Sequence, residues 1–138
     1  MGLDMYLTGK KFYTTLAGTQ RRKDAEGFEI ESEIVTLGYW RKHANLHGYI
    51  VQTYPEGKDE CQDITLDLDA INHLLDVVKN PEEEMPKTEG FFFGESDNSD
   101  EQIQDDVAQL TKALAFLTSP LIFEEKGVWR SVIYTASW

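Results

Sequence analysis

The segment from Tyr39 to His47 is the part of the chain best supplied with side chains that bind nucleotides. Tyr39 and Trp40 offer aromatic faces on which a base can stack, a contact worth about 1–3 kcal/mol in single-stranded nucleic-acid complexes. Arg41 offers a planar fork for phosphate or carboxylate, and Lys42 offers a mobile positive charge. His47 follows Trp40 by two helical turns, so both side chains would point to one side of a helix. The segment therefore predicts ligand-binding roles for all five residues.

The same residue types also have a purely structural interpretation. Tyr39 and Trp40 can be core aromatics that anchor a helix, while Arg41 and Lys42 can pair with the glutamates that precede them in residues 29–33. The residue types alone leave both interpretations open.

His43 and His47 have the i, i+4 spacing of two metal ligands on one helix face. A zinc hydrolase with this spacing carries a glutamate directly after the first histidine, and Ala44 stands there instead. A third ligand would have to come from a distant part of the chain. We therefore expect two half-buried imidazoles held by hydrogen bonds, with no metal and no cofactor.

Three other segments have residue types that can do chemistry. Phe91–Phe93 is a short aromatic run in which Phe92 is predicted to wall a ligand pocket, although such a run also suits a core. Asp97–Asp106 is acidic but lacks the glycine of a calcium loop, which favours a helix N-terminus. Cys61 is the only cysteine and has no Cys-x-x-Cys partner, which argues against a nucleophile. No phosphate loop or nucleophile elbow is present, so no catalytic residue is assigned.

The elements that must position these residues follow from hydrophobic periodicity and from capping signals. Alternation of apolar and polar residues predicts strands, and apolar residues three or four positions apart predict helices. Asp67 and Ser99 are the predicted N-caps of the second and third helix. The predicted elements are strands over 3–13, 28–35, 63–66 and 128–134, a short strand at 91–93, and helices over 39–52, 68–79 and 100–119. This order predicts an α+β domain with two layers, in which three helices cover a mainly antiparallel sheet of about four to five strands.

The 138-residue chain is expected to form a single domain over residues 1–138, since 41% of its residues are apolar. Its net charge of −12 argues against binding to nucleic-acid backbones. The charge is uneven: residues 1–42 carry a balance of +1 and the remainder a balance of −13. No apolar run could span a membrane, and a lone cysteine cannot form an internal disulfide, so a cytoplasmic location is expected. If the protein binds a small anion, the first third of the chain is the expected place.

Several stretches together resemble a family of small proteins encoded by phages and prophages. They are the opening Met1–Leu7, Leu37–Lys42 with His47 and Gly48, the run Phe91–Gly94, and the ending Ser137–Trp138. The resemblance extends over nearly the whole chain. It implies a bacterial host cytoplasm and, by analogy with other small phage proteins, a role against host defence.

Three functions are compatible with this resemblance. The first is a homo-oligomeric binding protein that sequesters a host nucleotide signal, such as a cyclic nucleotide or an ADP-ribose derivative. The second is a hydrolase of such a signal that uses His43 and His47. The third is an acidic inhibitor that binds a host protein. A binding protein is favoured over a hydrolase, because no catalytic constellation is evident.

Overall fold

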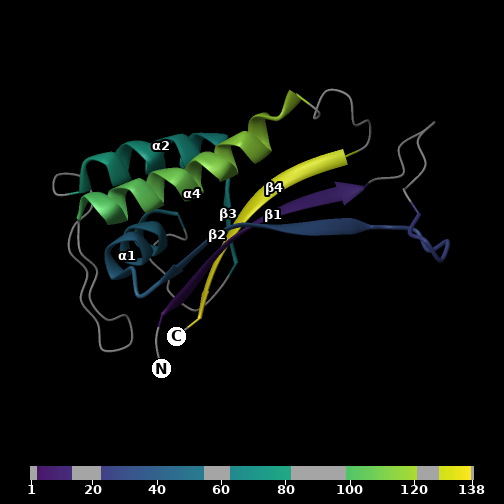
Figure 1. Cartoon of the computed structure of the whole chain (residues 1–138), viewed down its shortest axis with the longest axis horizontal. Coiled ribbons are helices and arrows are strands. Elements are labelled where there is room, and N and C mark those ends of the chain that lie inside the picture. Colours follow the sequence, from purple (N-terminus) through teal and green to yellow (C-terminus); the bar gives the residue numbers. More distant parts are fainter. Residues whose placement is uncertain (1–2, 14–22, 55–62, 82–98, 121–127, 138) are drawn as a thin grey trace.

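The computed structural model describes residues 3–13, 23–54, 63–81, 99–120 and 128–137 (Figure 1). These residues form one antiparallel sheet with the strand order β2-β1-β4-β3, together with three helices. The predicted α+β class is confirmed. In chain order the elements are β1 (Asp4–Tyr13), β2 (Ser32–Arg41), α1 (Ala44–Thr53), β3 (Ile64–Leu66), α2 (Leu68–Lys79), α4 (Asp100–Thr118) and β4 (Val128–Ser137).

The sheet has one covered face and one open face. Helices α2 and α4 lie side by side across the covered face, and α1 lies near the end of β2 (Figure 1). Along β1 the covered face holds the buried Met5 and Leu7, whereas Tyr6 and Phe12 are exposed on the other side. This alternation is the period of two that the sequence predicted for residues 3–13.

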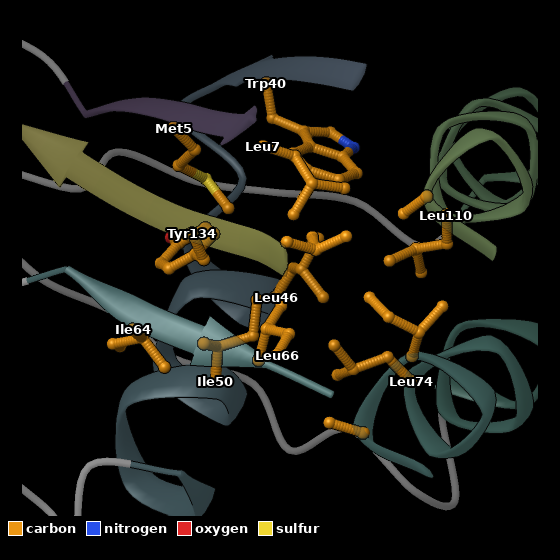
Figure 2. Close-up of a cluster of buried hydrophobic side chains, with 14 of the residues drawn as sticks. Met5, Leu7, Trp40, Leu46, Ile50, Ile64, Leu66, Leu74, Leu110 and Tyr134 are labelled. Atoms are coloured by element: carbon orange, nitrogen blue, oxygen red, sulfur yellow. The ribbon is translucent and has the colours of Figure 1, made fainter. Parts of the chain in front are cut away.

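The hydrophobic core fills the space between the covered face and the helices (Figure 2). It joins residues from every strand and helix, because each element contributes only one apolar face. The labelled core side chains of Figure 2 are Met5, Leu7, Trp40, Leu46, Ile50, Ile64, Leu66, Leu74, Leu110 and Tyr134.

Both predicted helix caps are confirmed. The Asp67 carboxylate accepts a hydrogen bond from the Ala70 amide at 2.8 Å and begins α2. The Ser99 hydroxyl accepts one from the Gln102 amide at 3.2 Å and begins α4. Each cap satisfies an amide that the first turn of a helix leaves without an intrahelical partner.

The predicted helix over 39–52 begins too early. Tyr39, Trp40 and Arg41 belong to β2, and α1 starts only at Ala44. Pairing with β1 across the sheet overrides the helical spacing that the sequence shows locally. The turn between the two elements passes through Lys42, whose φ is 58°. The predicted site segment therefore spans a strand end, a turn and a helix start.

The predicted second strand also begins too early, since β2 starts at Ser32 rather than at Phe28. Residues 24–28 form a tight turn instead. The Asp24 carboxylate accepts hydrogen bonds from the amides of Glu26 at 2.9 Å and Phe28 at 3.0 Å. Gly27 has a φ of 88°, which a residue without a Cβ adopts at little cost.

The spacing of Ile103, Val107, Leu110, Leu114 and Leu117 predicts the buried face of helix α4, and the face that is buried differs slightly from it. Val107, Leu114 and Leu117 are only partly buried against the core. The fully buried face lies beside them, and two of its five residues are polar. They are Asp106, Gln109, Leu110, Ala113 and Phe116. Among the helices of the described residues, none is long and apolar enough to cross a membrane.

Candidate functional site

A buried carboxylate connects β2, α1 and α4. Asp106 is 1% exposed. Its Oδ1 accepts hydrogen bonds from Trp40 Nε1 at 2.8 Å and from Gln102 Nε2 at 2.9 Å. Its Oδ2 lies 2.8 Å from His43 Nε2. An aspartate is rarely buried this deeply unless it is paired, and these three donors provide the partners.

The Asp106–His43 pair has the composition of a general-base pair, but it lacks access to a substrate. A carboxylate only accepts hydrogen bonds, so His43 Nε2 carries a proton and is the donor to Asp106. Its Nδ1 has no hydrogen-bond partner among the described residues, and the side chain is 1% exposed. The arrangement therefore holds β2 and α1 against α4, and a substrate in solvent cannot reach it.

His47 is buried as well, at 1% exposure. Its Nδ1 lies 2.6 Å from the Tyr134 hydroxyl in the core. The prediction that Trp40 and His47 share one side of a helix is wrong, because Trp40 is in β2. The two side chains nevertheless both point into the core. Among the described residues no group of three or more His, Cys, Asp or Glu side chains could hold a metal ion.

The exposed part of the predicted site lies on the open face of the sheet. Tyr39 is paired with Tyr6 across β2 and β1, and their ring centroids are 5.3 Å apart with an interplanar angle of 49°. Arg41 is paired with Asp4 two residues further along the two strands, on the same face of the sheet. We call Asp4, Tyr6, Tyr39, Arg41 and Lys42 the aromatic corner.

Hydrogen bonding and charge fix the geometry of the aromatic corner. Tyr39 is 45% exposed and Tyr6 42% exposed, so both rings offer area to a ligand. The Tyr39 hydroxyl donates to Asp4 Oδ1 at 2.5 Å, and this bond raises the pKa of Tyr39. The positive charge of Arg41 acts on the same hydroxyl in the opposite direction. Within the described part of the chain, no carboxylate forms an ion pair with Arg41 or Lys42.

The structure thus divides the predicted site residues into groups. Tyr39, Arg41 and Lys42 come together at the aromatic corner, Trp40 and His47 lie in the core, and Phe92 lies outside the described residues, as does Cys61. Ligand contact by any of them stays a prediction. Sequence reasoning missed Tyr6 and Asp4. Alternation along 3–13 already placed both on the exposed side, but the strand register that sets them beside Tyr39 and Arg41 was not predicted.

A second surface feature is an open groove of about 310 Å³. It lies where α1 ends, α2 begins and β3 passes. Beside it, the Tyr49 hydroxyl lies 2.5 Å from His73 Nε2. The groove is lined by Tyr54, Thr65, Asp67, Asp69, Ala70 and His73. Three of its lining residues already form hydrogen bonds within the protein: Asp67 caps α2, the Tyr54 hydroxyl donates to the Ala70 carbonyl, and His73 is bonded to Tyr49.

Tyr54, which lines the groove, makes the stability of the folded protein depend on pH. Its partial burial, with Tyr49 and Asp67 nearby, raises the pKa of Tyr54 to about 12. Tyr54 in the unfolded chain ionises near its ordinary pKa of 10.0, so its contribution to stability is full below that pH and is lost as the pH rises through about 12. We expect Tyr54→Phe to lose less stability than the wild type between pH 10 and 12 in urea unfolding. Equal losses in the two proteins would contradict this assignment.

Comparison of the chain with protein-family models, curated proteins and solved structures gives no match. The geometry of the described residues is therefore the basis for the functional proposal.

Proposed function

We propose that this protein binds a nucleotide-type small molecule at the aromatic corner and withholds it from other proteins. The proposed ligand is a host nucleotide signal, either a cyclic nucleotide or an ADP-ribose derivative. The proposed setting is the bacterial cytoplasm, where a phage-encoded protein of this kind would act against host defence. The observation that carries the proposal is the exposed Tyr6–Tyr39 pair with Arg41 and Lys42 at its end.

The aromatic pair supports recognition of a base. Two tyrosine rings anchored on neighbouring strands lose little conformational freedom when a planar group stacks on them. The Tyr39 ring is further held by its hydrogen bond to Asp4. Base stacking on aromatic side chains tolerates every base, because every base has a π-face. This part of the corner therefore supports binding to nucleotides as a class.

The two cations support recognition of phosphate. Arg41 and Lys42 are exposed and follow Tyr39 in the chain after the buried Trp40. Arginine presents parallel N–H donors that match phosphate oxygens. The rest of the chain carries most of the negative charge, so these cations mark a place where an anion meets less repulsion.

The proposal is tested by thermal unfolding with a panel of cyclic nucleotides and ADP-ribose compounds. A ligand at 100 times its Kd stabilises the folded state by about 2.7 kcal/mol, which raises the Tm by several degrees. We expect Arg41→Ala to weaken binding by about 10- to 150-fold, since a hydrogen bond to a charged group is worth about 1.5–3 kcal/mol. Tyr39→Ala should also weaken binding, because it removes a stacking surface.

Two matched variants serve as controls. Lys112→Ala removes an exposed cation from α4, and Trp129→Ala removes an aromatic side chain that is 65% exposed at the other end of the open face. Both should bind like the wild type. The proposal is wrong if no compound of the panel raises the Tm, or if the control variants lose as much affinity as Arg41→Ala and Tyr39→Ala.

Chromatography of the incubated ligand separates sequestration from hydrolysis. We expect the ligand to be recovered intact, because His43 and His47, the side chains proposed for hydrolysis, are each 1% exposed. Recovery of cleaved product would favour the hydrolase.

A further inference from the structure

One edge of the sheet is formed by β2, and its backbone groups alternate between facing β1 and facing outward. At one end Tyr13 donates its amide to the Glu31 carbonyl at 2.9 Å, and at the other Lys42 donates its amide to the Leu3 carbonyl at 2.7 Å. Residues 31, 33 and 35 therefore direct their backbone groups toward β1, as do residues 38, 40 and 42. The change from odd to even numbers occurs at Leu37, the extra residue of a β-bulge.

The outward-facing groups are satisfied on one half of this edge only. The amide of Tyr39 donates to Gln109 Oε1, so α4 closes the edge beyond the bulge. On the other half, Ser32, Ile34 and Thr36 face outward, and no described residue hydrogen-bonds to them from that side. A row of free amides and carbonyls is a template for pairing with another strand.

The side chain at the centre of this open half is unusual for an exposed edge. Ile34 is 70% exposed and lies on the open face of the sheet, opposite Lys10. Proteins commonly protect free edges with charged residues, prolines or bulges, and an isoleucine does the opposite. An apolar side chain at the middle of an unpaired edge leaves that edge open to pairing with another strand.

We propose that a second copy of this chain covers the edge, with the two β2 strands pairing antiparallel around a two-fold axis at Ile34. This register sets Ile34 against its own copy and Ser32 against Thr36 of the partner subunit. The three facing pairs exchange about six backbone hydrogen bonds and join two four-stranded sheets into one. The inference concerns assembly and holds whether or not the protein binds a nucleotide.

The residues on this stretch suit pairing with themselves. In the proposed register Glu33 faces Val35 of the partner subunit, so like charges are never directly opposite. The Glu33 carboxylate also accepts a hydrogen bond from the Tyr13 hydroxyl within its own chain. Lys11 on β1 is paired with Glu33, and Lys10 with Ile34, so positive charges on the neighbouring strand offset part of the negative charge that the glutamates bring to this edge.

The first test measures mass in solution by sedimentation velocity. The wild type should sediment at twice the 15.8 kDa mass of the chain. Ile34→Lys and Ile34→Glu should each sediment as a monomer, because each places like charges opposite each other at the two-fold axis. An equimolar mixture of the two variants should recover the dimer mass, because opposite charges then face each other. A monomeric wild type, or a mixture that stays monomeric, would overturn the proposal.

The second test fixes the register by disulfide formation in a Cys61→Ser background. Ile34→Cys should cross-link into a covalent dimer, since paired residues lie about 5.5 Å apart between Cα atoms, within disulfide range. Thr36→Cys is the matched control. Its two copies would lie four residues apart along the strands, roughly 13 Å, so it should not cross-link with itself. It should cross-link when mixed with Ser32→Cys. Cross-linking of Thr36→Cys alone, or none by Ile34→Cys, would exclude this register and the proposal with it.

Discussion

Asp106→Ala is expected to lower the free energy of unfolding by about 3–5 kcal/mol, the cost typical of removing one partner from a buried charged cluster. The substitution leaves the buried donors of Trp40 and His43 without an acceptor, and it removes the acceptor of the partly buried Gln102 amide. Each unsatisfied buried donor costs about 1–3 kcal/mol. Urea unfolding followed by Trp fluorescence measures the change, and the urea midpoint should fall with it.

Two further variants show whether the loss arises from the buried acceptor. Asp106→Asn keeps the shape, and its amide oxygen can still accept from Trp40 and Gln102, so it should lose less stability than Asp106→Ala. Glu101→Ala removes an exposed acid from the first turn of α4 and should change stability by less than about 1 kcal/mol. A loss below about 1 kcal/mol for Asp106→Ala would mean that the cluster does not hold the helices to the sheet.

Gly38→Val is expected to destabilise the fold by about 1–3 kcal/mol, the usual cost of an added side chain in a filled space. A Cβ at position 38 would lie 2.4 Å from Gln109 Oε1 and 3.1 Å from Gln109 Cβ, so Gln109 would have to leave its place. That movement breaks the hydrogen bond from the Tyr39 amide to Gln109, which closes this half of the β2 edge.

A double-mutant cycle with Gln109→Ala checks the cause. The truncation removes the atoms that a side chain at position 38 would meet, so Gly38→Val should cost less in the Gln109→Ala background than in the wild type. Unfolding free energies from denaturant titration give the coupling. Additive losses would show that Gly38→Val acts through another contact.

The elements that the sequence predicted well are those whose signals are local. Asp67 and Ser99 act on amides three residues away, so their caps can be recognised without knowing the fold. Strand β1 was predicted over its full length. One of its faces is buried along most of the strand, so its apolar and polar residues alternate clearly in the sequence. The α+β class follows from the order of these elements.

The candidate site depends on contacts that the sequence does not show. Trp40 has helical spacing to His47, yet pairing with β1 makes it part of a strand. Asp106 was predicted as one of several acids at a helix N-terminus, and its burial depends on Trp40, a donor 66 residues away. Tyr6 joins the aromatic corner only through the register of β1 with β2. In each case a distant partner decides what a residue does.

The position of β1 in the sheet has a consequence for synthesis of the protein. β1 pairs with β2 on one side and with β4 on the other, and Thr8 lies 125 residues before its hydrogen-bond partner Ile133. The β1–β2 hairpin can form early, but the second edge of β1 has to wait until β4 has been synthesised and has left the ribosome. Non-local pairing of this kind slows folding. During translation the nascent hairpin exposes an unpaired strand edge, and that is when a chaperone would protect it most.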